Sequence, residues 1–154
     1  MVWKVKRTLL KYTVYHPDHS KIVRITVKRG SYIIEDAMGK NIVFICENRP
    51  FNLTINGNAG DGSADIELEV TDSLVRPPRA TQLTLHWNGA IYTINQTDRR
   101  DFQIYRSGLQ LGNITGILKR TAFVELPDDE TMKFAALLYA LADRMLHEDD
   151  ICVI

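Results

Sequence analysis

The residues with the best chemistry for a metal ion lie in one short segment, His16-Pro-Asp-His19. Two imidazoles and a carboxylate are all ligands of transition metals. A tight site, however, needs three or four ligands held in fixed geometry, whereas proline and strand-like flanking residues predict a hairpin tip here. His86 and His147 would have to come from distant parts of the chain. We therefore expect a solvated turn and no bound metal.

Two other polar segments resemble cation-binding sequences in composition alone. The segment Asn58-Ala-Gly-Asp-Gly-Ser-Ala-Asp65 has the residue types of a calcium loop. It lacks the alternating oxygen ligands and the closing glutamate of an EF-hand. The acidic run Glu148, Asp149 and Asp150 follows a predicted helix. We expect a flexible loop over residues 56–65 and a solvated helix exit at residues 148–150, without a cation at either.

The sequence carries no signature of covalent or nucleotide-dependent catalysis. It contains no Gly-x-Ser-x-Gly elbow, no phosphate-binding loop and no Gly-x-Gly-x-x-Gly. Its two cysteines, Cys46 and Cys152, lie far apart and are expected to be reduced. We expect neither catalytic residues nor a cofactor. Because a catalytic triad is assembled in space, one alternative stays open, an enzyme or small-ligand site in a pocket that gathers His86, Arg99 and Arg100.

Basic and acidic residues are equal in number but unevenly distributed. There are 19 of each, so the formal net charge is zero. Residues 1–30 nevertheless hold eight Lys or Arg and one acid, Asp18, whereas residues 31–75 hold eight acids and two basic residues. Zero net charge argues against non-specific binding to nucleic acid. A local basic surface built from the first 30 residues remains compatible with it.

The N-terminal basic residues are the strongest functional signal. In strands they leave the apolar face and reach solvent; they are Lys4, Lys6, Lys11, Arg24 and Lys28. Each contributes about 1 kcal/mol near an anionic membrane, and we expect Trp3 to act as an interfacial anchor among them. The pattern favours a binding module for anionic lipid or for a protein partner. The alternative is a solubilising surface, whose charges interdigitate with Glu67 and Glu69 on a neighbouring strand.

The elements that must position these residues are mostly strands, because apolar residues recur with a period of two. The clearest strands are residues 22–28 and 66–70, and Asn88-Gly89 joins residues 82–87 to 90–95 in a type I′ hairpin. Further strands are predicted at residues 9–15, 32–35, 42–46, 102–105, 110–111, 114–118, 123–126 and 151–154. About 10–12 short strands separated by turns are typical of an antiparallel barrel or sandwich.

One helix interrupts this pattern, from Thr131 to about His147. Asp128 and Asp129 precede it as candidate N-caps, and the segment Phe134–Ala142 is apolar on every face. A helix without a polar stripe must be surrounded by other elements, so we expect it at the centre of a closed or nearly closed barrel. Its core side chains are then Phe134, Leu137, Leu138 and Leu141. An oligomer interface is the alternative role for this helix.

Two stretches in the last third of the chain resemble the tubby C-terminal-like superfamily, which includes LURP-one-related proteins, phospholipid scramblases and small bacterial proteins. They are Gly108-Leu-Gln-Leu-Gly-Asn-Ile-Thr-Gly116, similar to the family's strand-turn-strand before its helix, and Phe134-Ala-Ala-Leu-Leu-Tyr-Ala-Leu-Ala-Asp143. The resemblance implies a closed barrel of about twelve strands around a central hydrophobic helix. It carries over no binding residues, because the basic lipid-binding motif of tubby domains has no residue-by-residue match here.

Length and hydropathy complete the expectations. A chain of 154 residues can bury its own core as a single domain spanning residues 1–154. The longest apolar run, residues 134–142, has nine residues, against the ~20 that a membrane-spanning helix needs. The first residues lack the features of a signal peptide. We therefore expect a cytoplasmic protein without a transmembrane segment, peripheral to the membrane where it binds lipid.

Overall fold

Apolar and polar residues alternate along the strands, so the apolar side chains point into a shared interior, which a single helix fills. The structure, a computed structural model, describes residues 1–8, 11–18, 20–28, 31–36, 38–49, 52–57, 60–68, 80–98, 100–117, 119–128 and 130–146. The elements are β1 (Val2–Thr8), β2 (Lys11–Tyr15), β3 (Ile22–Lys28), β4 (Ser31–Asp36), β5 (Asn41–Arg49), β6 (Asn52–Asn56), β7 (Gly62–Leu68), β8 (Ala80–Trp87), β9 (Ala90–Asp98), β10 (Asp101–Arg106), β11 (Leu109–Thr115), β12 (Thr121–Glu125) and α1 (Met132–Leu146).

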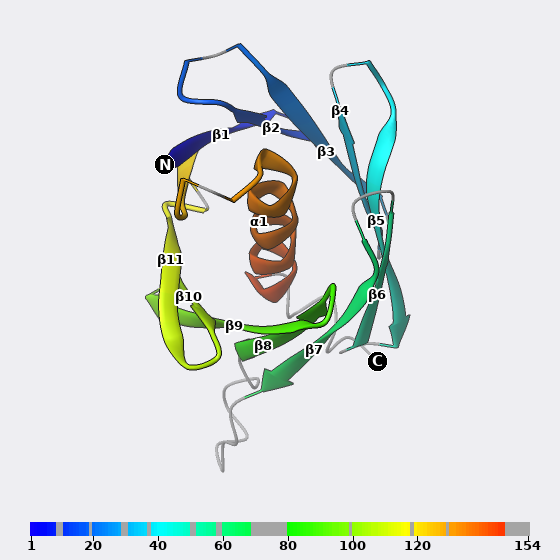
Figure 1. Ribbon diagram of the computed structural model, residues 1–154, viewed down its shortest axis with the longest axis vertical. Helices are drawn as coiled ribbons and strands as arrows, with labels where there is room; N and C mark the ends of the chain where they lie inside the picture. Colours follow the sequence, from blue (N-terminus) through cyan, green and yellow to red (C-terminus); the bar gives the residue numbers. More distant parts are fainter. Residues whose placement is uncertain are drawn as a thin grey trace, which may run out of the picture.

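The strands form a closed antiparallel barrel (Figure 1). Each strand pairs with its neighbours in the chain, and β12 closes the ring on β1 with pairs from Val2–Glu125 to Lys6–Thr121. Each of the twelve described strands therefore has a hydrogen-bonded partner on both sides, which limits the exposure of strand edges. The fold class predicted from the sequence, a mostly β barrel with one C-terminal helix, is confirmed.

Helix α1 lies inside the ring of strands (Figure 1). All of its residues from Phe134 to Met145 are buried, and Leu137, Leu138 and Leu141 are 0% exposed. The barrel wall thus occupies the apolar faces of the helix, and the alternative of an oligomer interface finds no support. Within the described part of the chain, no helix has the length and apolarity needed to cross a membrane.

The start of α1 is capped by a residue that was not predicted for this role. Thr131 Oγ1 accepts a hydrogen bond from the Phe134 N–H at 3.2 Å, the geometry of an N-cap. Asp128, a predicted cap, instead accepts a hydrogen bond from the ammonium of Met1 at 2.8 Å. That hydrogen bond lowers the pKa of the Asp128 carboxyl. Asp129, the other predicted cap, lies outside the described residues.

A buried polar cluster holds the last turns of α1 against the barrel wall. The Asp143 carboxylate accepts hydrogen bonds from the hydroxyls of Tyr12 at 2.8 Å and Tyr32 at 3.0 Å. The ring of Tyr139 packs edge-on against Tyr12, with 5.1 Å between centroids. Burial, and after it the charge of Asp143, raises the pKa of all three phenols well above the ordinary 10.0. Because the cluster is buried, its hydrogen bonds favour one rotation and depth of the helix in the barrel.

The structure corrects the strand prediction in four places. Strands β1 and β6 are absent from that prediction. Strand β11 runs unbroken through Gly112, where two separate strands are predicted, and a Cβ at this glycine would lie 2.0 Å from the Glu125 carbonyl oxygen. The predicted loop over residues 56–65 is shorter, because β6 ends at Asn56 and β7 begins at Gly62. Residues 9–10, 69–70, 118 and 151–154 of the predicted strands lie outside the described residues.

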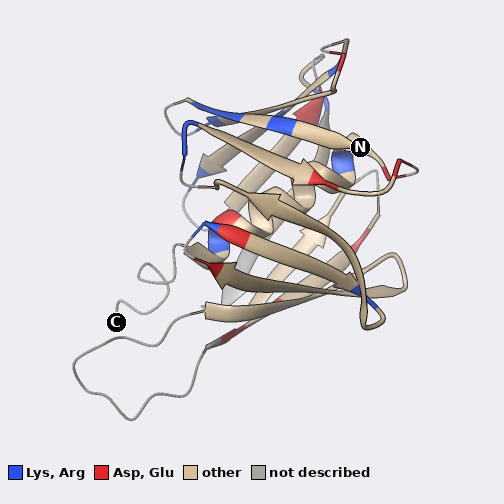
Figure 2. Ribbon diagram, turned by 90° about the vertical axis from the view of Figure 1, so that its left-hand side faces the viewer, with Lys and Arg blue, Asp and Glu red and all other residues tan. Residues whose placement is uncertain are grey.

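The two ends of the barrel differ because α1 enters at one of them. The helix-start end is where the even-numbered strands β2, β4, β6, β8, β10 and β12 finish. The helix-finish end is where the odd-numbered strands β1, β3, β5, β7, β9 and β11 finish, toward the last turn of α1. In Figure 2, the N-terminus marks the helix-start end, since β1 begins beside the last residue of β12.

Candidate functional site

Five basic side chains leave the barrel through the outer face of three adjacent strands. On β1, Trp3 and Val5 point into the core and are each 1% exposed. Lys4 and Lys6 alternate with them and therefore point outward. The same alternation on β2 and β3 turns out the other three side chains. We call the surface made by Lys4, Lys6, Lys11, Arg24 and Lys28 the basic face. Figure 2 shows Lys and Arg along the strand that leaves the N-terminus.

The strand register brings these side chains together. Lys6 lies opposite Thr13, which lies opposite Arg24. Lys6 and Arg24 therefore stand two strands apart, a distance of about 10 Å between backbones. Lys11 lies opposite Thr26 on β3, between Arg24 and Lys28 in sequence. The five predicted lipid-binding residues thus share one continuous surface.

The charges of the basic face are open to solvent. Lys4 is half-buried and the other four side chains are exposed. The Lys6 ammonium lies 5.6 Å from the centroid of the Tyr15 ring, a cation–π contact that keeps the charge. Within the described residues, no ion pair joins any of the five to an acid. Two acids adjoin this group: Glu35 lies opposite Arg24 across the β3–β4 register, and the exposed Glu125 on β12 lies opposite Val2, one outward position from Lys4.

Three basic residues that the sequence reasoning missed extend this charge toward the helix-finish end. Arg7, Lys119 and Arg120 are all exposed, and the Arg7 N–H donates to the Arg120 carbonyl oxygen at 3.1 Å. Closure of the ring by β12 and β1 brings these residues from opposite ends of the chain to one place. No local spacing in the sequence signals that contact.

The predicted interfacial anchor is wrong. Trp3 is 1% exposed inside the barrel, and its indole N–H has no hydrogen-bond partner among the described residues. An aromatic side chain that is exposed beside the basic face is Phe123, which is 41% exposed and lies opposite Lys4 across the β12–β1 register. Val2, 43% exposed, flanks the same place on β1. Trp3 fails as an anchor because β1 turns Trp3 and Val5 inward.

The alternative in which acids on a neighbouring strand neutralise the basic residues is also wrong in its geometry. Glu67 is exposed on β7, which pairs with β6 and β8. Strands β4, β5 and β6 separate it from β3 in the ring. Glu69 lies outside the described residues. The acids that were expected beside the basic face therefore do not adjoin it.

The histidine turn is held by its own hydrogen bonds. His16 Nδ1 lies 2.7 Å from Asp18 Oδ1, which also accepts the Ser20 N–H at 2.8 Å. Hydrogen bonds from Ser20, through its side chain and then its backbone, lower the pKa of Asp18 to about 2. His19 and residues 147–150 lie outside the described residues. Over the residues that the structure describes, no three His, Cys, Asp or Glu side chains converge on a metal site.

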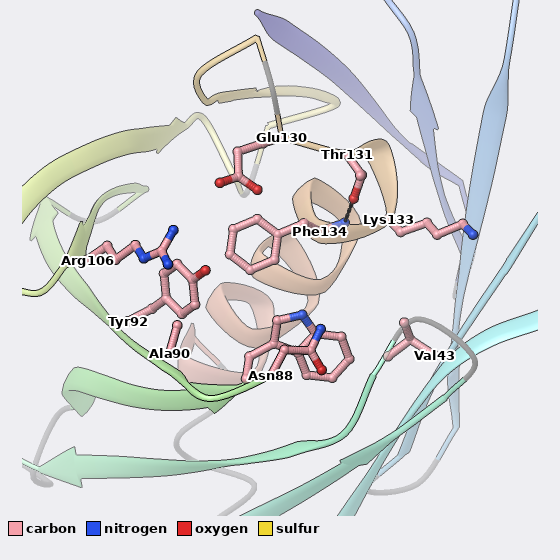
Figure 3. A pocket seen from close by; sticks show the side chains of 10 residues that line it. Val43, Asn88, Ala90, Tyr92, Arg106, Glu130, Thr131, Lys133 and Phe134 are labelled. Atoms are coloured by element: carbon pink, nitrogen blue, oxygen red, sulfur yellow. Dashed lines mark hydrogen bonds between the residues drawn. The ribbon is translucent and has the colours of Figure 1, made fainter.

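The pocket expected to gather His86, Arg99 and Arg100 is not built from these residues. His86 is exposed near the end of β8 at the helix-start end, whereas Arg100 precedes β10 at the helix-finish end. Arg99 lies outside the described residues. A hollow of about 430 Å³ opens instead at the start of α1 (Figure 3). Its charged lining residues are Arg106, Glu130 and Lys133.

Comparison with known proteins gives a likeness in fold. No protein-family model matches the sequence, and no curated protein is significantly similar to it. Among solved structures, the chain is similar to the X-ray structure of the Arabidopsis thaliana protein AT5G01750, with a TM-score of 0.55 and 9% sequence identity. The match covers 92% of this chain and 89% of the plant protein. At this identity the likeness shows a shared fold.

Proposed function

We propose that this chain is a non-catalytic, helix-filled barrel that attaches to anionic membrane surfaces through the basic face. One observation carries the proposal. Lys4, Lys6, Lys11, Arg24 and Lys28 project from one continuous outer surface and form no ion pair with any described acid. Basic groups in such an arrangement attract the negative potential of lipid headgroups.

We further propose that the chain is a tubby-like barrel, related to the LURP-one and scramblase group. The two stretches that resemble this superfamily occupy matching places in the fold. Residues 108–116 hold β11 and the end of the turn before it, and residues 134–143 form the buried middle of α1. The full-length likeness to the Arabidopsis thaliana barrel supports the same assignment.

The expected attachment is weak and depends on salt. At about 1 kcal/mol for each basic residue near the surface, five residues contribute on the order of 5 kcal/mol, which corresponds to a Kd of roughly 0.2 mM. The exposed Phe123 ring beside Lys4 adds an apolar contact with the headgroup region. Because the Debye length is only about 10 Å at 0.1 M salt, added salt weakens the charge-driven part.

The same chemistry favours the inner side of a membrane. Anionic lipids give the cytoplasmic leaflet its negative surface potential. A protein that binds through exposed Lys and Arg, with the Phe123 ring beside them, remains in exchange with the aqueous phase. We therefore propose a cytoplasmic location with reversible, peripheral attachment.

Vesicle co-sedimentation tests this function. Purified protein is mixed with phosphatidylcholine vesicles and with vesicles that also contain phosphatidylserine, at low salt and at high salt. We expect binding to the anionic vesicles at low salt, little binding to the neutral vesicles, and release at high salt. A variant with Lys4, Lys6, Arg24 and Lys28 all reversed to Glu should not bind. No binding at low salt, or undiminished binding by that variant, would overturn the proposal.

A further inference from the structure

The two ends of the barrel differ in charge. At the helix-finish end, the ends of β1, β2 and β3 and the turn before β12 carry exposed basic side chains. We call these side chains the basic rim; they are Arg7, Lys11, Lys28, Lys119 and Arg120. In Figure 2, Lys and Arg colour strand ends on the side of the barrel opposite the label N. Outside the rim, this end also carries Arg100 and the acids Glu67, Asp98 and Asp101, on β7 and around the turn between β9 and β10.

Acidic side chains predominate at the helix-start end. Among the described residues, the turns and strand ends there carry six acids, Asp18, Asp36, Asp61, Glu125, Asp128 and Glu130. They carry four basic side chains, Lys21, Lys40, Arg106 and Lys133. The barrel is therefore more positive at one end than at the other, although its formal net charge is zero. An anionic surface attracts the positive end and repels the negative one.

Backbone hydrogen bonds fix the turn that presents Lys119 and Arg120. The Lys119 N–H donates to the Gly116 carbonyl oxygen at 2.9 Å, and the Arg7 N–H donates to the Arg120 carbonyl oxygen at 3.1 Å. The Ile117 N–H donates across the barrel end to the Arg100 carbonyl oxygen at 3.1 Å. The backbone under these charges is therefore held in place before any surface is met, which lowers the entropic cost of binding.

Arg7 extends the basic rim from the outer wall toward the barrel mouth. Its side chain is exposed, and it lies opposite Tyr12 in the β1–β2 register. Burial raises the pKa of Tyr12 and of Tyr139, and the positive charge of Arg7 acts on both phenols in the opposite direction. Because Tyr139 belongs to α1, the Arg7 charge lies near the last turns of the helix as well as near the wall. The positive surface thus includes part of the end of the barrel.

Two orientations on a bilayer can be compared. If the barrel lies flat on the basic face, the adjoining acids Glu35 and Glu125 approach the headgroups together with the lysines. If the barrel stands on its helix-finish end, the start of β1 is about 20 Å from the headgroups, since its seven residues rise by about 3.3 Å each. That is twice the Debye length of about 10 Å at 0.1 M salt. The acids of the helix-start end are then screened from the membrane, and the basic rim contacts it.

We propose that the barrel stands on an anionic bilayer by its helix-finish end, with the basic rim at the headgroups and the helix-start end in water. This inference rests on the proposed membrane attachment and adds the orientation of the molecule. Lys6 and Arg24 extend the positive surface from the rim along the outer wall of β1 and β3. The barrel therefore leans toward that wall, and both groups of basic residues contribute to the contact.

Fluorescent labels at matched positions test this orientation. Thr8 and Ser20 are exposed hydroxyl residues at opposite ends of the wall made by β1, β2 and β3, and Leu109 is exposed at the helix-start end. Each is changed to Cys in a Cys46→Ser/Cys152→Ser protein and labelled with nitrobenzoxadiazole. Phosphatidylserine-containing vesicles carry a nitroxide quencher on the headgroup of phosphatidylcholine. We expect a large loss of fluorescence for the label at position 8 and little loss at positions 20 and 109.

Two triple variants of equal charge change test the contribution of the basic rim. Arg7→Gln/Lys119→Gln/Arg120→Gln removes three rim charges, and Lys21→Gln/Lys40→Gln/Arg106→Gln removes three exposed charges at the helix-start end. The rim variant should bind anionic vesicles at least about 20-fold more weakly than the parent, since each basic residue near the surface contributes about fivefold. The other variant should stay within about twofold of the parent, because its charges are screened. Thermal melts show that both are folded.

Three results would overturn the orientation while leaving the membrane attachment in place. Equal quenching at positions 8 and 20 would show a barrel that lies flat on the basic face. Stronger quenching at position 109 than at position 8 would show that the opposite end meets the bilayer. Equal loss of affinity in the two triple variants would show that only the total charge matters. Failure of the parent protein to bind anionic vesicles would instead overturn both the attachment and the orientation.

Discussion

Strands β1, β2 and β3 carry apolar side chains on their inner face and basic side chains on their outer face, and the two faces have different roles. The inner face buries Val5, Val14 and Ile25 against the interior at no more than 1% exposure. The outer face carries the basic side chains in the alternate positions. Packing therefore dictates one face, whereas stability places few demands on the other. The comparison teaches that inner substitutions should affect folding and outer substitutions should affect binding.

The largest effect is expected at the centre of the inner region. Leu138 is 0% exposed on α1, so Leu138→Lys would bury an unpaired charge at a cost of several kcal/mol, against a typical net stability of about 5–15 kcal/mol. We expect loss of the cooperative thermal melt by circular dichroism. Leu109→Lys, at a position 77% exposed, is the matched control and should melt as the parent does. A normal melt for Leu138→Lys would contradict the enclosed helix.

Alkaline pH should loosen the same interior. The pKa values of Tyr12, Tyr32 and Tyr139 are raised above 10.0 in the folded chain. Unfolded tyrosines ionise at about 10, so above that pH the folded state binds more protons than the unfolded state and stability falls. Because unfolded tyrosines are only half ionised at pH 10, the loss between pH 10 and 11 is about 1 kcal/mol per tyrosine, or about 3 kcal/mol for three. Urea unfolding at pH 8, 10 and 11 measures it. A flat profile would contradict the buried cluster.

Single hydroxyl deletions in this cluster should have smaller effects. Tyr32→Phe and Tyr12→Phe each remove one hydrogen bond to the buried Asp143 carboxylate, worth about 1.5–3 kcal/mol. Tyr105→Phe, which removes a hydrogen bond to Gln103 at a half-buried site, is a matched control with a smaller expected loss. Denaturant titration gives each free energy of unfolding. If Tyr32→Phe lowers the free energy of unfolding no more than Tyr105→Phe does, the buried cluster does not stabilise the fold.

The smallest effect is expected at the aromatic ring of the outer surface. Phe123→Ser should leave the melting temperature close to that of the parent, because the ring is 41% exposed. It should weaken binding to anionic vesicles several-fold, since burying apolar area contributes about 25 cal/mol per Å². Ile91→Ser, at a position 52% exposed on β9, is the control that should bind normally. Equal binding by both variants would remove Phe123 from the membrane contact.

What the sequence could predict depends on how local the cause is. The enclosed helix follows from nine consecutive apolar residues, and the outward direction of Lys6 and Arg24 follows from the period of a strand. The prediction for Trp3 is wrong because the alternation that turns Lys4 and Lys6 outward places Trp3 and Val5 on the inner face of β1. Strand β6 is missing from the prediction because its five residues, Asn52–Asn56, give too short an alternation of apolar and polar side chains.

The parts that could not be predicted depend on ring closure. Phe123 meets Lys4 only because β12 pairs with β1. The hollow takes its residues from the turn after β8, the end of β10 and the start of α1. These segments are separated in sequence by more than ten residues, and the barrel brings them to one end. The glycine at position 112 has a similar cause. Because β11 pairs with β12, a Cβ at this position would clash with the Glu125 carbonyl oxygen.

The most direct test of a separable basic face compares two double variants of equal charge change. Lys6→Glu/Arg24→Glu alters the basic face, and Lys40→Glu/Arg100→Glu alters exposed residues elsewhere on the barrel. Both are measured for melting temperature and for affinity to phosphatidylserine-containing vesicles at low salt. We expect equal melting temperatures, and a loss of affinity of at least about 30-fold for the first variant, from two charges at about 1 kcal/mol each. Equal affinities of the two variants would contradict the account.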